Sequence, residues 1–201
     1  MKVKRIAVYL LAIIFAGGLF ACSAAKVTRV AADEIIDFSG NWNDTDSHQV
    51  SAEMIRDAID RPWVDEYLRK FNKKPRVIVG IVVNKSDEHI TTETFIKDLE
   101  IALTNSGKVV MVASKDQRGE LREERDEQSR NARVGTVKAH GQETGADFMI
   151  KGQINTIPDQ KKGAELKYYQ VELEMINIET NEKVWIGQKQ IKKVIAKKSY
   201  K

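Results

Sequence analysis

Apolar residues recur at a helical spacing in two early stretches of the chain and at a strand spacing through its last third. The first helical stretch follows the capping candidates Asn43–Asp46, and its apolar residues share one face: Val50, Met54, Ile55, Ala58 and Ile59. Pro62 suits the first position of a second helix, in which aromatic residues recur every four positions: Trp63, Tyr67 and Phe71. We therefore predict two successive amphipathic helices that contribute to the core.

A strand, a helix and a second strand are predicted next. Within Arg76–Asn84, odd-numbered and even-numbered positions are both apolar, which indicates a central strand covered on both faces. Thr91 or Thr92 caps the following helix, Gly107 ends it, and its buried face is formed by Phe95, Ile96, Leu99, Ala102 and Leu103. Lys108–Ala113 is again apolar. Strand, helix and strand in this order predict a right-handed crossover between parallel neighbours.

The stretch Lys115–Arg130 carries charges of both signs and has Leu121 as its one large apolar residue. Such a stretch is typical of a solvated helix or a mobile arm, and the alternative is a projecting arm that docks a partner. A further helical face is expected from the residues that follow, before Gly141 and Gly145 close it: Ala132, Val134 and Val137.

The last third alternates between apolar and polar residues, which predicts three antiparallel strands in a meander. Pro158–Gly163 is the expected first turn and Glu179–Glu182 the second. Ile35, Ile36 and Phe38 suggest a brief edge strand before Gly40. The fold class predicted from these elements is α+β, with a mixed sheet of about five strands and helices on one face, because the carboxylates between Gln170 and Glu174 are costly to bury.

The amino terminus has the layout of an export signal. Lys2, Lys4 and Arg5 precede an apolar run that ends on Cys22, and this run is too short to be a comfortable membrane span. Leu19 and Ala21 resemble the lipobox of bacterial lipoproteins, which implies cleavage before Cys22 and its lipidation. Cys22 is the only cysteine, so a disulfide within one molecule is impossible. The alternative is a chance cysteine in an ordinary signal peptide or signal anchor.

Charge and length limit the remaining possibilities. The chain has 33 Lys and Arg and 29 Asp and Glu; three of the bases and none of the acids precede Cys22, so 30 and 29 remain. A nearly neutral mature chain gives no reason to expect nucleic-acid binding. We predict a signal peptide at 1–21, a lipidated short tether at 22–38, one globular domain at 39–195 and a basic tail at 196–201.

Residues that could support catalysis are sparse, and we predict that the protein is not an enzyme. The pair Asp44 and Asp46 could form a metal or phosphoryl site, but helix capping explains it at lower cost. The histidines lie in polar or capping contexts: His48, His89 and His140. Glu88 and His89 beside Glu93 form the one cluster of interest, and it precedes a capped helix where acids are expected. We expect no metal site and no cofactor.

Four segments in order resemble one family. They are WNDTDS at Trp42–Ser47, the block Glu93–Glu124, ETGADFMIKGQI at Glu143–Ile154, and YYQVELEMINIETNEKVWIGQKQIKK at Tyr168–Lys193. Together they resemble LpoB, the family of lipoprotein activators of bifunctional penicillin-binding proteins. The resemblance implies a fold similar to the amino-terminal domain of TolB, a monomer, and an outer-membrane lipid anchor on the periplasmic side. It also implies allosteric activation of a class A peptidoglycan synthase through that enzyme's small docking domain, without catalysis by the activator.

The tether departs from the family pattern. Enteric members carry a long Pro- and Gln-rich tether that lets the domain reach through the peptidoglycan, whereas here about 16 residues would span only some 20–24 Å. The protein would therefore act across a narrower gap, sit in the inner membrane, or serve another partner. The resemblance places the docking contacts at Lys151, where enteric members have a tyrosine, and at Glu182.

Two other functions remain open at this stage. The first is a structural subunit of an outer-membrane secretion or assembly apparatus, because CsgG-type lipoproteins have a related sheet. That function would require long amphipathic hairpins able to enter a membrane, which the sequence does not suggest. The second is a hydrolase of the cell wall.

Overall fold

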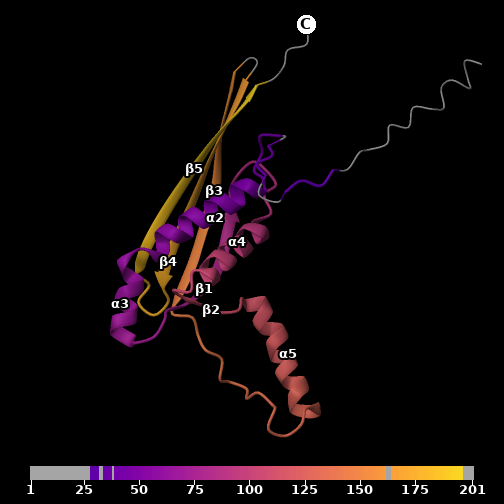
Figure 1. Ribbon diagram of the computed structural model, residues 1–201, viewed down its shortest axis with the longest axis vertical. Helices are drawn as coiled ribbons and strands as arrows, with labels where there is room; N and C mark the ends of the chain where they lie inside the picture. The colour runs from indigo at the N-terminus through magenta and orange to yellow at the C-terminus, as the bar shows by residue number, and fades with distance from the viewer. Residues whose placement is uncertain (1–27, 32–33, 38, 162–163, 197–201) are drawn as a thin grey trace, which may run out of the picture. The chain divides into compact units, whose positions relative to one another are not determined.

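The computed structural model describes residues 28–31, 34–37, 39–161 and 164–196 (Figure 1). Cys22, the predicted signal peptide, most of the predicted tether and the predicted tail beyond Ala196 lie outside these residues. The elements follow one another in the order α2 (Asp44–Ile59), α3 (Pro62–Phe71), β1 (Arg76–Asn84), α4 (Thr92–Asn105), β2 (Val110–Met111), α5 (Lys115–Asn131), β3 (Phe148–Lys161), β4 (Ala164–Asn177) and β5 (Lys183–Ala196).

Five strands form one mixed sheet in the order β2-β1-β3-β4-β5. β1 pairs in parallel with β2 and with β3, as the crossover through α4 predicts, whereas β3, β4 and β5 form the expected antiparallel meander. The α+β fold with a five-stranded mixed sheet is therefore confirmed. The prediction that Arg76–Asn84 is the central strand is wrong, because β3 occupies the middle of the sheet.

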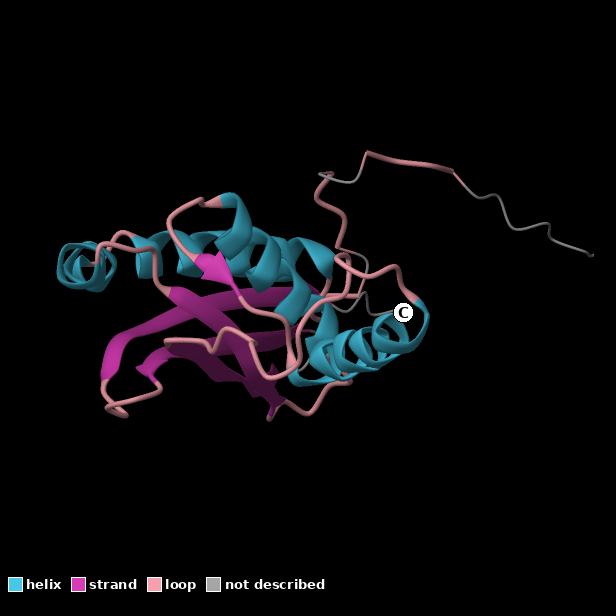
Figure 2. Ribbon diagram, turned by 90° about the horizontal axis from the view of Figure 1, so that it is seen from below, coloured by secondary structure: helices cyan, strands magenta, loops and turns pink. Residues whose placement is uncertain are grey.

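α2 and α4 pack on one face of the sheet and leave the other open (Figure 2). The covered face holds side chains from all three meander strands and both helices, among them Phe95, Leu99, Ile150, Ile154, Tyr169, Leu173 and Trp185. β1 is not covered on both faces along its length as predicted. Ile81 is 74% exposed, because the open face receives no helix where β1 ends.

The helices begin where local sequence satisfies their free backbone N–H groups. Asn43 and Asp46 form a reciprocal capping box at the start of α2. Pro62 occupies the first turn of α3, where its missing N–H costs nothing. α4 starts after Thr91, which makes no side-chain capping bond, so its position depends on the apolar face it buries. These starts agree with the predicted ones.

Two glycines allow close approaches within the meander. A Cβ on Gly152 would lie 2.0 Å from the backbone oxygen of Glu172 on β4, and one on Gly187 would lie 2.1 Å from the ring of Trp185. The Trp185 ring therefore folds over its own strand, and its Nε1 donates a hydrogen bond of 2.7 Å to Asp57 Oδ2 on α2. This contact joins β5 to the helical layer.

The predicted first turn of the meander, Pro158–Gly163, begins too early, and its last two residues lie outside the described residues. β3 and β4 pair residue for residue from Phe148 opposite Asn177 to Lys161 opposite Ala164, so Pro158 and Asp159 lie on a strand. They look like a turn in the sequence because this end of the hairpin is exposed and therefore polar. The brief edge strand is also absent from the described residues, since Ile35–Asp37 belong to no strand and Phe38 is outside them.

α5 and the residues after it form what we call the arm, residues 115–145. The solvated helix predicted for Lys115–Arg130 is confirmed, because α5 buries none of its residues and runs away from the sheet (Figure 1). The prediction of a further helical face from Ala132 onward is wrong. Ala132 is extended, and Val134 is 94% exposed, since apolar spacing without a surface to pack on does not sustain a helix.

Candidate functional site

The open face of the sheet carries the outward side chains of the meander. The candidate docking residues belong to the end of the sheet where β3 begins and β4 ends. Lys151 on β3 is exposed and lies opposite Glu174 on β4, which in turn lies opposite Ile186 on β5. Lys183 Nζ is 2.7 Å from Glu174 Oε1. Lys151 thus borders an ion pair and an apolar side chain that is also exposed, a mixture typical of a protein contact surface.

Glu182 follows the tight turn between β4 and β5. Its carboxylate accepts a hydrogen bond of 2.7 Å from the Thr180 hydroxyl, and its carbonyl accepts one of 2.9 Å from the Asn177 N–H. Asn181, with a φ of 62°, provides the left-handed residue that this turn requires. The start of β3 pairs with the end of β4, so Lys151 and Glu182 belong to the same end of the sheet.

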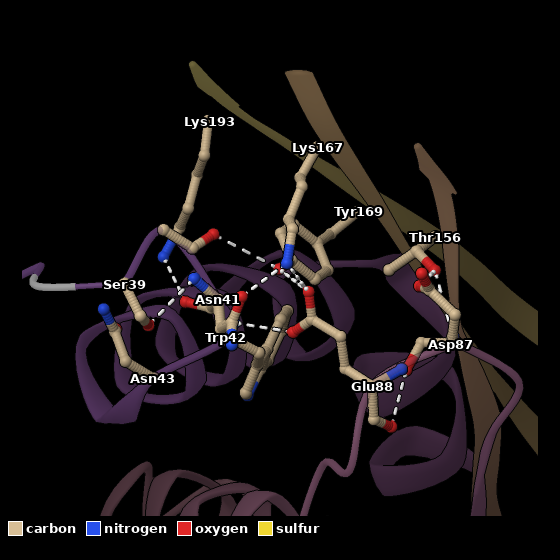
Figure 3. Close-up of polar contacts among 12 residues, drawn as sticks. Ser39, Asn41, Trp42, Asn43, Asp87, Glu88, Thr156, Lys167, Tyr169 and Lys193 are labelled. Atoms are coloured by element: carbon tan, nitrogen blue, oxygen red, sulfur yellow. Dashed lines mark hydrogen bonds and ion pairs between the residues drawn. The ribbon is translucent and has the colours of Figure 1, made fainter. Parts of the chain in front are cut away.

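At the opposite end of β4, a polar cluster attaches the segment before α2 to the sheet (Figure 3). The Glu88 carboxylate accepts hydrogen bonds from Lys167 Nζ at 2.5 Å, from the Tyr169 hydroxyl at 2.7 Å and from the Trp42 N–H at 3.1 Å. Lys167 also donates to the Asn41 side chain. The partners come from three separate parts of the chain, so the cluster fixes them together.

The charge states of Glu88 and Tyr169 favour the contact that holds the segment before α2 on the sheet. Burial opposes the charged form of Glu88, but the hydrogen bonds from Lys167, Tyr169 and Trp42 outweigh it, so the pKa of the Glu88 carboxyl lies below its usual value. Burial and the neighbouring Glu88 raise the pKa of the Tyr169 hydroxyl far above its usual value. Glu88 therefore stays an acceptor and Tyr169 a donor, and neither holds a proton that it can exchange near neutral pH.

A second lysine extends the attachment. Lys193 Nζ on β5 lies 2.5 Å from Asp46 Oδ2, 2.9 Å from Asp37 Oδ2 and 2.8 Å from the Asn41 carbonyl oxygen. Asp46 is thus both part of the capping box and the partner of a lysine. Among the described residues, no three His, Cys, Asp or Glu side chains lie close enough together to hold a metal ion.

The cluster proposed from sequence around Glu88 does not assemble as a catalytic group. Glu88 is directed to Trp42, Lys167 and Tyr169, and not to His89 or Glu93. Its long-range partners lie some eighty residues away, and no short motif indicates them. The one sequence signal was an acidic residue in the loop between a strand and a helix.

Sequence reasoning also missed Asp98, which lies on the buried face of α4. Only 7% of it is exposed, its Oδ1 is 3.2 Å from His48 Nδ1 on α2, and its Oδ2 has no hydrogen-bond partner. Burial raises the pKa of the Asp98 carboxyl, and His48 offsets this in part. The sequence did contain a signal for this buried carboxylate. Asp98 comes three residues after Phe95 and next to Leu99, and this helical spacing places it on the face that packs on the core.

None of the helices among the described residues has the length and apolar character needed to cross a membrane. Cys22, the proposed site of lipidation, is outside those residues.

Several solved structures resemble the chain in fold. The carboxy-terminal domain of LpoB from Salmonella enterica is 17% identical, with a TM-score of 0.37, over 65% of this chain and 93% of that one. Lipoprotein GNA1162 from Neisseria meningitidis is 13% identical, with a TM-score of 0.40, over 60% and 83%. Escherichia coli LpoB, solved by NMR, is 14% identical, with a TM-score of 0.38, over 85% and 82%.

No curated protein matches the sequence significantly. The family described as "Peptidoglycan-synthase activator LpoB" matches residues 46–191, well over half of the chain. This range runs from the first turn of α2 into β5 and includes α3, α4 and α5 in full. The chain therefore belongs to the LpoB family of peptidoglycan-synthase activators, which are non-enzymatic regulators of class A penicillin-binding proteins.

Proposed function

We propose that this activator binds the docking domain of its class A synthase with the end of the sheet that carries Lys151 and Glu182. The observation that carries the proposal is the position of this end relative to the attachment cluster. Lys167 and Asn177 are ten positions apart on β4, which corresponds to about 33 Å at the rise of a strand. The chain enters the domain at one end of the sheet and exposes the candidate residues at the other.

The anchor is the second part of the proposal. Lipid on Cys22 holds the protein in the outer membrane on its periplasmic side, the location of the family, or in the inner membrane if the short tether cannot span the gap. Several acyl chains, at about 0.8 kcal/mol per buried methylene, hold a protein firmly on a membrane. Mass spectrometry of the mature chain tests this, and an amino terminus without lipid would refute it.

The activity test uses the full-length chain in detergent with its full-length synthase. Glycan polymerisation is measured with and without the activator, and the dissociation constant is measured in parallel. Stimulation together with binding is the expected result. Absence of both would end the proposal that this synthase is the partner.

The residue test compares two double variants. Lys151→Ala with Glu182→Ala should weaken binding by about tenfold, as the loss of central interface contacts does. Lys85→Ala with Glu93→Ala removes the same two charges from exposed positions elsewhere, so the affinity should stay unchanged. Equal effects of the two double variants would place the interface elsewhere on the domain. Sedimentation of the free chain should give a monomer.

A further inference from the structure

The end of α3 forms a hollow with the segment just before β3 and with the end of β4 and the turn that follows it. The hollow has a volume of 270 Å³, and residues from three parts of the chain line it, among them Tyr67, Phe71, Lys73, Ala146, Asp147 and Ile178. We call this region, with Arg69, Lys70 and Lys74 around it, the α3 corner. It lies beside the turn that ends in Glu182, because Ile178 opens that turn.

One wall of the hollow is aromatic and partly unprotected. The Tyr67 and Phe71 rings have centroids 4.5 Å apart, and Tyr67 packs on Phe148 of the core at 5.4 Å. Phe71 is 46% exposed and Ile178 is 45% exposed on the open side. Burial and the hydrogen bond to Asp147 raise the pKa of the Tyr67 hydroxyl to about 12, so the wall stays uncharged. An apolar side chain placed here would cover both exposed residues.

The α3 corner is also basic. Arg69, Lys70, Lys73 and Lys74 fall within six residues, and the chain has no Asp or Glu from Tyr67 to Ser86. Lys70 Nζ lies 5.0 Å from the Phe71 ring centroid, and Lys73 Nζ lies 4.0 Å from Asp147 Oδ1. Lys73, Asp147 and Glu179 are the charged residues that line the hollow. Arg69, Lys70 and Lys74 are exposed at neighbouring positions of the chain and add three positive charges to this region. The positive excess favours an anionic occupant.

We propose that the α3 corner binds an acidic segment of the synthase and takes one apolar side chain of that segment into the hollow. This inference rests on the proposed function, because it adds a contact of defined chemistry to the same end of the domain. A protein segment fits better than a membrane surface. The apolar residues line a recess with carboxylates in its wall, whereas a bilayer would require apolar side chains that protrude from the surface.

The test measures the affinity of the full-length chain for the full-length synthase, both in detergent, at several salt concentrations. Lys70→Glu with Lys74→Glu should raise the dissociation constant by about tenfold or more and flatten its dependence on salt. Lys85→Glu with Lys115→Glu makes the same change of net charge at two exposed lysines outside the α3 corner, and it should leave the affinity within about twofold.

A second variant tests the hollow without removing any charge. Ala146→Leu fills the space that the partner's side chain would occupy, and it should also raise the dissociation constant by about tenfold. Its thermal unfolding should match the wild type, which shows that the domain remains folded. Unchanged binding by both corner variants, or equal loss with the control pair, overturns the inference but leaves the proposed function standing. A wild-type chain that neither binds nor stimulates the synthase ends both.

Discussion

α4 and α5 are helices of similar length that belong to different parts of the molecule. α5 has the better start, a reciprocal capping box between Ser114 and Gln117, whereas Thr91 makes no side-chain capping bond to α4. Yet α4 buries Phe95, Leu99 and Leu103, and α5 buries nothing. Capping decides where a helix begins, and an apolar face decides whether it joins the core.

The two helices are also held by different forces. α4 packs on the sheet and on α2 through apolar area, which is lost only when the whole core opens. The arm is held to itself by Glu143, which accepts hydrogen bonds from Arg122 at 2.8 and 2.9 Å and from Arg125 at 2.7 Å. Ion pairs at an exposed site are weakened by salt. The arm can therefore open while the core stays folded.

The largest effect is expected from a truncation in α4. Phe95 is fully buried and touches the edge of the Trp42 ring, with centroids 6.1 Å apart, so Phe95→Ala should cost about 3–5 kcal/mol of unfolding free energy. Leu121→Ala removes the large apolar residue of α5 and should change the same quantity by less than about 0.5 kcal/mol. Urea unfolding measures both. Similar losses would show that the arm belongs to the core.

A smaller effect is expected from a buried polar contact. Tyr169→Phe removes the hydroxyl that donates to Glu88, and it should cost about 1–2 kcal/mol because the hydrogen bond is made to a charged group. Tyr168→Phe is the matched control on the neighbouring position, whose hydroxyl reaches Gln170 on the open face. No difference between the two variants would mean that the attachment cluster contributes nothing to stability.

Because of Asp98 on α4, the free energy of unfolding is expected to depend on pH. Its carboxyl has a reference pKa of 3.8 that burial raises in the folded state, so folding binds a proton and stability falls as pH rises from about 3.8 through the higher folded value. Asp98→Asn should therefore be more stable than the wild type at pH 7, by about 1 kcal/mol, with the gap closing towards pH 4. Urea unfolding at both pH values tests this, and a gap independent of pH would refute it.

The smallest effect on global stability is expected in the arm. The hydrogen bonds from Arg122 and Arg125 lower the pKa of Glu143 to about 2 from 4.5, so the contact is complete above pH 4.5 and is lost as pH falls towards 2. Glu143→Gln should leave urea unfolding unchanged but reduce hydrogen-exchange protection in α5. Glu124→Gln, which makes the same change at a side chain that accepts a hydrogen bond from Gln128 within the helix, is the control. Protection equal to the wild type would show that Glu143 does not hold the arm.

Most of the fold follows from periodicity, because each element that packs on the core has a one-sided apolar pattern. Most of the predicted apolar faces of α2 and α4 are buried for this reason, among them Val50, Met54, Ile55 and Ala58 in α2 and Phe95, Leu99 and Leu103 in α4. The predictions failed for stretches that do not pack on the core, because the apolar pattern of such a stretch does not mark a buried face. The exposed end of the β3–β4 hairpin looks like a turn, and the extended residues after Asn131 look helical, although neither stretch contacts the apolar core.

The sites are harder to predict than the fold, for a physical reason. Glu88 and Tyr169 meet across 81 positions, and a single sequence contains no signal for such a contact. The α3 corner joins residues from α3, from the segment before β3 and from the turn after β4, so its hollow exists only after folding. Lys151 and Glu182 were chosen by resemblance, and the structure places them at one end of the sheet, where they stay a prediction.

The position of β5 bears on how copies of this protein meet one another. β5 is the last strand of the sheet among the described residues, and its outer backbone groups could template pairing with a neighbouring molecule. The strand contains four lysines and no carboxylate. Lysines along an edge strand disfavour its pairing with a strand of a neighbouring molecule, so this edge should discourage fibre-like stacking between copies.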